Sequence, residues 1–358
     1  MIGSNNRRAI MVTVRARSDL GRTRDHNEDF YVVADLDSGR DLSRGGPHRL
    51  ERDGSMFLVA DGMGGAAAGE LASSMAGGAI IKHFKEHWSR EIDRSPERFS
   101  DHLKAAVEQA NNDIFSYARE HPEVRGMGTT ATVAGILSGT LYLAQVGDSR
   151  GYLVRNGEAT QITKDQSLMQ RLVDAGELTE EEAAQSERRN IILQALGPDP
   201  KIRVDLTWQE LQRGDTLVIC SDGLSGQVKR EEIGEAVKNA ADLDQVCDRL
   251  IALANERGGP DNITVIAARF DGEGLPPARP SGDVGYHAIP HDSDEHPATP
   301  PPSGEAIEPA PDSPTPPVGT PPSAPPARRS GSPRTIAVIT GIGLVLLGLL
   351  YFLLADRN

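Results

Sequence analysis

Short runs of apolar residues alternate with glycine-containing turns over much of the chain. Each run is five to eight residues long and rich in Val, Ile, Leu and Ala, which is typical of buried β-strands. The Asn156-Gly157 pair favours a tight hairpin, and residues 137–140 form a similar glycine turn. The expected strands cover residues 56–60, 130–137, 141–146, 151–155, 216–220 and 263–270.

Two longer segments have the spacing of amphipathic helices. Residues 70–88 and 103–115 place apolar side chains at positions i, i+3, i+4 and i+7, so each helix has one apolar face to bury. Antiparallel strands with such helices outside them predict an α+β layered domain over residues 10–271. A polar, glycine-rich piece, residues 37–54, is expected to form a surface loop or a hairpin tip.

The composition changes sharply after residue 271. Residues 272–334 hold 18 of the chain's 24 prolines and lack any hydrophobic period, so they cannot build a packed core. This composition predicts a disordered, semi-rigid spacer of polyproline type. Its PxxP-like runs leave open a second role, as ligands for adaptor proteins.

The last apolar segment, residues 335–355, contains 21 residues and no charge. A helix of this length spans roughly 30 Å, the thickness of a bilayer core, so we expect a transmembrane helix rather than a buried core helix. Arg328, Arg329 and Arg334 precede it, and positive flanks favour the cytoplasmic side. The sequence therefore predicts a single-pass protein of the cytoplasmic membrane with its large N-terminal part in the cytoplasm.

Charge and cysteine content exclude several classes of function. The formal net charge of −14 argues against nucleic-acid binding, which needs a basic face. The two cysteines, Cys220 and Cys247, form neither a disulfide framework nor a CxxC zinc motif. The N-terminus has no secretory signal pattern, because its short apolar run continues directly into arginines.

Aspartates recur at the ends of the expected strands. Asp61, Asp148, Asp222 and Asp261 each stand beside a glycine or another small residue. A single Asp-Gly pair is most simply a turn, but four such positions together indicate a carboxylate cluster at one edge of a sheet. Such crowding needs a cation, and an all-oxygen set of carboxylates, a Gly62 carbonyl and water favours Mg²⁺ or Mn²⁺. Calcium is the rival cation, although the EF-hand spacing is absent.

The run at residues 22–29 adds groups that a bare metal site lacks. Glu28 and Asp29 are further carboxylates able to orient metal-bound water, and Arg24 offers a planar fork suited to phosphate. Taken alone, Arg24 is more simply a solvated arginine in a charged loop. Beside a metal cluster, phosphate binding becomes the better interpretation.

These residues resemble the metal-dependent protein phosphatases of type 2C, the serine/threonine class, and especially its bacterial members. The resemblance covers about residues 14–270, and the motifs stand in family order. They are RDHNED at 24–29, VADGMGG at 59–65, GMGTT at 126–130, VGDSRGYL at 146–153, CSDGLS at 220–225 and GGPDNIT at 258–264.

The resemblance implies an α-β-β-α sandwich with metals at one edge of paired antiparallel sheets. It implies that two metals, Mn²⁺ or Mg²⁺, are held by four groups, with Glu28 and Asp29 holding their waters and Arg24 the substrate phosphate. A looser third metal would join Asp148 to Asp222, and residues 165–195 would form a flap that tunes substrate choice. The four groups of the two-metal centre are Asp61, the Gly62 carbonyl, Asp222 and Asp261.

The mechanism implied by the resemblance uses a metal-activated water, with Arg24, Asp61 and Asp222 as the catalytic residues. No phosphoenzyme forms, so both cysteines are bystanders, and Ser149 and Ser221 are structural. Three positions depart from the family. Met63 stands where some relatives have a histidine, Gly226 stands where many have an acidic or amide residue near the third metal, and Gln166 stands where a histidine is frequent.

Together these features predict a membrane-tethered phosphatase that acts on phosphoserine and phosphothreonine in proteins and opposes bacterial serine/threonine kinases. Its catalytic domain is expected to be monomeric. Two rivals remain: a catalytically silent scaffold that binds phosphopeptides, and an anchored structural protein whose proline-rich stalk is the functional part. The sequence leaves open the protein substrates, the metal used and activity on phosphotyrosine.

Overall fold

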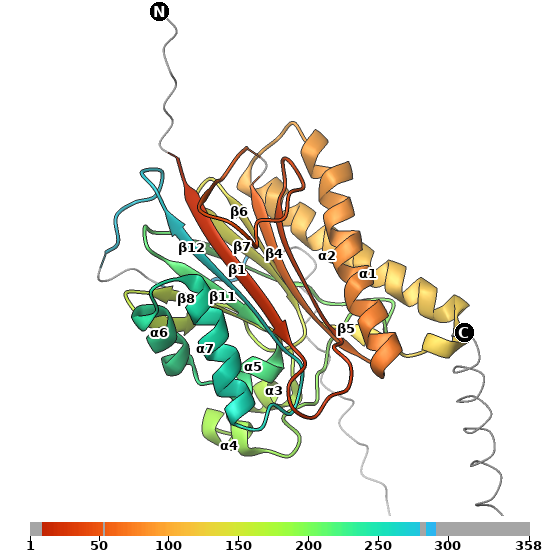
Figure 1. Cartoon of the computed structure of the whole chain (residues 1–358). Helices are drawn as coiled ribbons and strands as arrows, with labels where there is room; N and C mark the ends of the chain where they lie inside the picture. The colour runs from red at the N-terminus through yellow and green to blue at the C-terminus, as the bar shows by residue number, and fades with distance from the viewer. Residues whose placement is uncertain (1–8, 53, 280–283, 291–358) are drawn as a thin grey trace, which may run out of the picture. The chain divides into compact units, whose positions relative to one another are not determined.

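The protein is seen in a computed structural model that describes residues 9–52, 54–279 and 284–290 (Figure 1). The strands in these ranges are β1 (Met11–Asp19), β2 (Asp29–Asp35), β3 (His48–Arg49), β4 (Ser55–Met63), β5 (Gly128–Thr129), β6 (Ala131–Leu137), β7 (Thr140–Val146), β8 (Arg150–Arg155), β9 (Glu158–Gln161), β10 (Asp205–Glu210), β11 (Thr216–Cys220) and β12 (Ile263–Asp271). The helices are α1 (Ala66–Glu86), α2 (Pro96–Glu120), α3 (Leu168–Asp174), α4 (Glu180–Gln185), α5 (Asp222–Ser225), α6 (Arg230–Asn239) and α7 (Leu243–Glu256), with 3₁₀ turns η1 (Trp88–Arg90) and η2 (Pro122–Val124).

Two antiparallel sheets form the centre of the domain. One has the strand order β3-β1-β12-β11-β8-β9, and the other has the order β10-β7-β6-β4-β2, with β5 paired to β4. Figure 1 shows α1 and α2 outside the second sheet and α6 and α7 outside the first. The predicted α+β sandwich of two antiparallel sheets flanked by helices is confirmed.

Strand β4 shows why the apolar runs are continuous rather than alternating. Met56 and Leu58 pack toward α1 and α2, whereas Phe57 and Val59 belong to the core between the sheets, and all four are fully buried. Successive side chains of a strand point to opposite faces, so a strand covered on both faces is apolar at every position. The hairpin turn predicted at Asn156-Gly157 is also present. These two residues have φ values of 54° and 84°, and a tight type I′ turn requires positive φ at both positions.

The outer helices pack through the apolar faces that their spacing predicts. In α2, Leu103, Ala106 and Ile114 are fully buried, and the Ser95 side chain caps the helix by accepting from Arg98 N. On the opposite side, the buried residues of α7, among them Leu250, form a third apolar cluster with strands β11 and β12. The result is a central sandwich with a helix layer on each outer surface.

Residues 37–54 are not only a surface loop, and this part of the prediction is wrong. Leu42 is 1% exposed and belongs to the core between the sheets, while β3 pairs with β1. One apolar side chain among many polar ones gives no period, so its burial is invisible in the pattern. Strand β1, which we did not predict, buries Val12, Val14 and Ala16 at alternating positions, and this period of two was a usable signal.

The start of the expected spacer packs on the domain. Leu275 is 2% exposed in the core between the sheets. Residues 284–290 lie along the edge strand β10, where Trp208 N donates to His287 O at 3.0 Å and Ile289 N donates to Leu206 O at 2.8 Å. This pairing covers an otherwise open sheet edge. The packed part of the chain therefore continues past residue 271, where we expected it to end.

The remainder of the expected spacer and the expected transmembrane helix, residues 335–355, lie outside the described residues. In the ranges that the structure describes, no helix combines the length and the apolar character needed to cross a membrane.

Candidate active site

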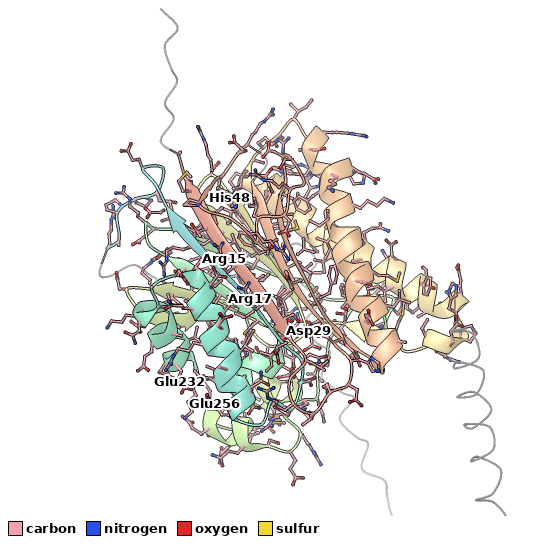
Figure 2. All side chains as sticks on the ribbon, in the orientation of Figure 1. Arg15, Arg17, Asp29, His48, Glu232 and Glu256 are labelled. Carbon is pink, nitrogen blue, oxygen red and sulfur yellow. The ribbon has the colours of Figure 1, made fainter. Side chains whose placement is uncertain are left out.

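The predicted carboxylates meet at one end of the sandwich because of how the antiparallel strands run. Asp29 begins β2 and pairs with Asp61 near the end of β4, in the second sheet. In the first sheet, Asp222 begins α5 just after the end of β11, with Ser221 between them, and Asp261 lies just before β12, with Asn262 between them. Figure 2 shows Asp29 at the end of the sheets where α5 and β5 also lie in Figure 1. Asp148, in the turn between β7 and β8, completes the group.

A direct hydrogen bond joins the two sheets inside this group. Ser221 Oγ donates to Asp29 Oδ2 at 2.8 Å and accepts from Thr264 N at 3.0 Å. The other oxygen of Asp29, Oδ1, is buried and has no hydrogen-bond partner. Ser221 is thus structural, as predicted, because it holds Asp29 of one sheet against β11 and β12 of the other.

Asp61 is held through its backbone by the Gly-Met-Gly-Thr-Thr segment. Asp61 N donates to Thr130 Oγ1 at 3.0 Å, and Thr130 N donates back to Asp61 O at 2.9 Å. The Thr130 hydroxyl also lies 2.9 Å from Ser149 Oγ, next to Asp148. These contacts use the backbone of Asp61 and fix its position beside Thr130. The role of Thr130 was missed because a threonine at the start of a strand carries no signal of its own.

Glycines allow the backbone to close around Glu28. Gly62 N donates to Glu28 O at 3.1 Å, and a Cβ on Gly62 would overlap the Gly69 and Glu28 carbonyl oxygens. A Cβ on Gly69, in α1, would overlap the Glu28 carboxylate itself. Glu28 is 9% exposed, so its carboxylate lies against the start of α1. Gly69 is a further site residue that the sequence pattern did not reveal.

Arg24 lies within the aspartate group. Its Nη2 donates to Asp261 Oδ2 at 2.7 Å, and the Arg24 side chain is 47% exposed. Asn262 fixes the loop that carries Arg24: its Oδ1 accepts from Glu28 N at 2.8 Å and its Nδ2 donates to His26 O at 2.9 Å. A cation at this place suits an anionic substrate, although its pairing with a predicted metal ligand was not foreseen.

Burial and mutual repulsion make these acids costly to ionise together. Burial, followed by the charge of Asp29, raises the pKa of Asp61 well above its usual range, and Asp222, Asp148 and Asp261 add to it. Burial also raises the pKa of Asp29 to about 7 and that of Asp148 to about 8. The Asp61 carboxylate is thus affected by the charges of four other aspartates.

Burial also raises the pKa of two other acids of the group, Asp222 and Glu28. For the pKa of Asp222, the charge of Asp261 adds to the effect of burial. A divalent cation reverses this penalty, because it stabilises the ionised carboxylates around it.

The donor set fits a hard cation. Only oxygen ligands are present in the group, and two of them, Asp29 Oδ1 and Asp222 Oδ1, are buried without a partner. Over the described residues, no three acidic, histidine or cysteine side chains are close enough together to hold a metal ion.

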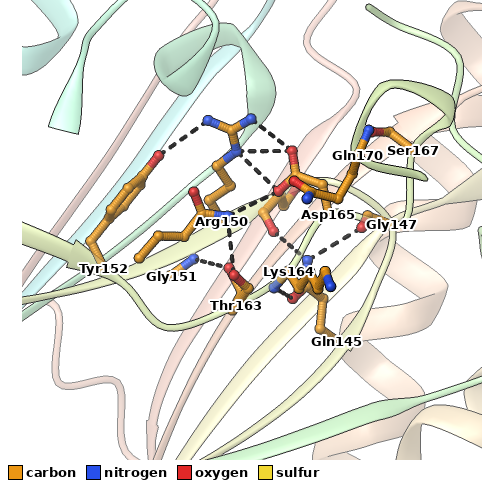
Figure 3. Close-up of polar contacts among 12 residues, drawn as sticks. Gln145, Gly147, Arg150, Gly151, Tyr152, Thr163, Lys164, Asp165, Ser167 and Gln170 are labelled. Carbon is orange, nitrogen blue, oxygen red and sulfur yellow. Dashed lines mark hydrogen bonds and ion pairs between the residues drawn. The ribbon is translucent and has the colours of Figure 1, made fainter. Parts of the chain in front are cut away.

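The Asp148 turn is tied to the predicted flap. Gly147 N donates to Gln166 Oε1 at 3.0 Å, and Gln166 N donates to Gly147 O at 2.9 Å. Arg150 holds Asp165 through Nε at 3.0 Å and Nη2 at 2.7 Å, as Figure 3 shows. The flap contains α3 and α4, and Leu193 N closes its base by donating to Gln166 O at 2.7 Å. Gln166 thus links the turn of Asp148 to both ends of the flap.

The other two departures from the family, Gly226 and Met63, and the two cysteines differ in their surroundings. Gly226 N donates to the backbone oxygen of Asp222 at 2.7 Å, so this position is adjacent to a predicted ligand but offers no side chain. Met63, at the end of β4, contributes no titratable group. Cys220 and Cys247 are fully buried, and burial raises the pKa of each thiol to about 12, which agrees with a bystander role.

Comparison with known proteins gives consistent matches over the same region. A family model described as protein phosphatase 2C matches residues 43–265. The serine/threonine phosphatase stp of Listeria monocytogenes is 37% identical over 256 residues, covering 71% of this chain and 94% of that protein. The serine/threonine protein phosphatase PstP of Mycobacterium tuberculosis is 38% identical over 260 residues, covering 72% of this chain and 45% of that protein.

Solved structures show the same similarity. The catalytic domain of PstP in complex with two manganese ions is 37% identical, has a TM-score of 0.59 and covers 73% of this chain and 99% of that chain. A Streptococcus agalactiae serine/threonine phosphatase is 33% identical, has a TM-score of 0.63 and covers 72% of this chain and 99% of that chain.

Proposed function

This chain belongs to the protein phosphatase 2C family, and from that premise we propose that its domain hydrolyses phosphoserine and phosphothreonine in proteins with two divalent cations, Mn²⁺ or Mg²⁺. The observation that carries the proposal is the buried acidic group that contains Asp61, with Arg24 at its rim. The manganese ions in the PstP structure support the choice of cation.

The residues of this chain divide the work by position. We assign the cations to Asp61, the Gly62 carbonyl, Asp222 and Asp261. When bound, the cations would supply Lewis acidity and would activate a water for in-line attack on phosphorus. Glu28 and Asp29 orient water at the cations, and Ser221 holds Asp29 in place at 2.8 Å. Asp148 joins Asp222 at a looser third position.

Arg24 binds the phosphate oxygens of the substrate. Its guanidinium is exposed enough to reach a substrate, and its Nη2 lies 2.7 Å from Asp261 Oδ2. When the substrate binds, its phosphate replaces the Asp261 carboxylate as the anion that Arg24 contacts. A planar fork suits two phosphate oxygens and neutralises the charge that they carry in the transition state. Met63 cannot donate a proton, so a water, either from solvent or held at the cations, would have to protonate the departing serine or threonine oxygen.

No side chain acts as a nucleophile. Cys220 is fully buried, and burial raises its pKa to about 12, so it stays protonated. The hydroxyls of Ser149 and Ser221 are engaged with Thr130 and Asp29. Direct attack by water is the remaining route, and it leaves no phosphoenzyme.

Attachment to the cytoplasmic membrane is a further part of the proposal. The uncharged segment 335–355 and the arginines before it support a single transmembrane helix with the domain on the cytoplasmic side. Tethering would raise the effective concentration of the enzyme near membrane-anchored serine/threonine kinases, whose action it would oppose. A reporter fused to the C-terminus should be exposed outside the cytoplasm, and a cytoplasmic reporter would refute this topology.

The activity is tested by phosphate release from a phosphothreonine peptide. The full-length protein in detergent is compared with Mn²⁺, with chelator, and as Asp222→Asn with Mn²⁺. We expect release only in the first condition. No release in any condition from a folded protein would reject the enzyme and favour a phosphopeptide-binding scaffold.

A further inference from the structure

A pocket lies at the end of the first sheet that is opposite to the acidic group. Its volume is about 320 Å³, and it is lined from the end of β8, the β8–β9 turn, the loop before β11, helix α6 and the end of β12. Arg269 lines it, whereas Asp261 precedes the same strand at its other end. At about 3.3 Å per residue, β12 alone separates the pocket from the acidic group by roughly 25 Å. The pocket is therefore no extension of the candidate active site.

Basic side chains dominate the lining. Arg213, Lys238 and Arg269 all border the pocket, in a chain whose formal net charge is −14. In the described part of the chain, none of the three is paired with a carboxylate. Arg213 Nη2 donates to Leu275 O at 3.3 Å, and Arg269 Nε donates to Thr216 Oγ1 at 3.5 Å. Three positive charges thus face one hollow without an internal counter-ion.

The single acid of the lining is already neutralised. Asp215 is 1% exposed and accepts from Arg155 through two bonds, of 2.9 Å from Nε and 2.7 Å from Nη2. Gln212 N donates to the same carboxylate at 2.7 Å, and Arg155 also donates to Glu210 O at 2.9 Å. The Arg155–Asp215 ion pair is therefore a fixed, neutral part of the pocket lining. Its carboxylate is held by these hydrogen bonds and cannot turn to neutralise the three basic side chains.

The arrangement matches a compact dianion. Two guanidinium forks and one ammonium provide donors for all the oxygens of a phosphate, and the Lys238 stem is held against Gly157 of the β8–β9 turn. Val154, Val237 and Ala278 supply apolar wall for the carbon atoms beside the phosphate. A volume of about 320 Å³ holds a phosphorylated side chain but not a large ligand.

We propose that this pocket binds the phosphate monoester dianion of a phosphorylated serine or threonine, at a site separate from the one that performs hydrolysis. Free inorganic phosphate shares the same chemistry and is the second source to distinguish. The proposal does not depend on catalytic activity, since none of the pocket residues belongs to the acidic group.

The test measures binding to the full-length protein in detergent by calorimetry, at 150 mM salt and with chelator present to prevent hydrolysis. All proteins carry Arg24→Gln, so that the candidate active site loses its phosphate ligand. The probes are a phosphothreonine peptide, the same peptide without phosphate, and inorganic phosphate. The variants are Lys238→Gln, Arg269→Gln and their combination. The matched control is Lys82→Gln with Arg90→Gln, which removes the same charge from exposed positions on α1 and η1.

We expect saturable binding of the phosphopeptide, at least a tenfold loss in the double pocket variant, and less than a twofold change in the control. Equal binding of the unphosphorylated peptide, or an equal loss in the control, would overturn the proposal, and so would the absence of binding to the parent protein. Tighter binding of inorganic phosphate than of the phosphopeptide identifies the free anion as the ligand and overturns the phosphoprotein source. Because Lys238 is exposed on a helix, the single Lys238→Gln variant keeps the test valid if the double variant fails to fold.

Discussion

Replacing Ser221 by alanine should weaken metal binding although Ser221 is not a metal ligand. Its hydroxyl donates to Asp29 Oδ2 at 2.8 Å and accepts from Thr264 N at 3.0 Å, so the change removes one contact between the sheets and one within the first sheet. Asp29 then loses the hydrogen bond that ties its carboxylate to the other sheet and gains freedom to turn. Loss of a residue that orients groups at a metal typically costs about 10- to 100-fold in metal affinity.

The same change should lower stability by a calculable amount. A buried donor left without a partner costs about 1–3 kcal/mol, and Thr264 is fully buried. For a domain of this size, each kcal/mol lowers Tm by about 2–4 °C, so we expect a decrease of roughly 2–12 °C.

Two measurements and one control decide the matter. Calorimetric titration with Mn²⁺ gives the affinity without reference to catalysis, and thermal unfolding with chelator gives the stability. Ser225→Ala makes the same chemical change in α5, one turn further along, where no hydrogen bond of the side chain is involved. If Ser221→Ala binds Mn²⁺ within twofold of both the natural protein and Ser225→Ala, the inter-sheet hydrogen bond does not order Asp29 and the reasoning fails.

Three further changes probe other parts of the structure. Leu275→Ala should cost about 2–5 kcal/mol in urea unfolding, because Leu275 fills the core between the sheets, and exposed Leu193→Ala should change little. Gln166→Ala should raise KM for protein substrates more than for a small phosphate ester, since Gln166 links the Asp148 turn to the flap; equal effects on both substrates would contradict this role. Burial, with the nearby His87 and His102, lowers the pKa of His83 to about 4 in the folded protein. The unfolded chain therefore binds a proton at His83 at a higher pH than the folded protein does. As a result, stability falls as the pH drops from about 6.5 towards 4. His83→Gln should therefore lose less Tm between pH 7.5 and pH 5 than the natural protein, and equal losses would show that another group is responsible.

Much of the fold and the acidic group could be predicted because the signals were local. Strand β4 is apolar at every position from Met56 to Ala60 and reaches Asp61-Gly62 near its end, so burial, strand end and carboxylate are all visible within a few residues. Strand β1 was missed although its buried positions alternate with polar ones, two of which are Arg15 and Arg17. Figure 2 shows both arginines on β1, and the structure pairs them with Asp244 of α7, more than 220 residues away in the sequence.

The supports of the site could not be predicted, because each of them depends on a distant partner. Asn262 serves the site only through Glu28 and His26, and Thr130 only through Asp61 and Ser149. The pairing of residues 284–290 with β10 likewise uses backbone groups, which the sequence pattern does not report.

The position of β12 has a consequence for how the protein becomes active during synthesis. The last strand of the domain lies between β1, the first, and β11, so the first sheet stays divided until residues 263–271 have left the ribosome. Arg24 and Asp29 are made early, but Asp261 and Thr264 arrive only with this closing strand. A nascent chain therefore has no partly active phosphatase domain. We expect hydrolytic activity to begin only when residues 263–271 have been made and the domain is complete.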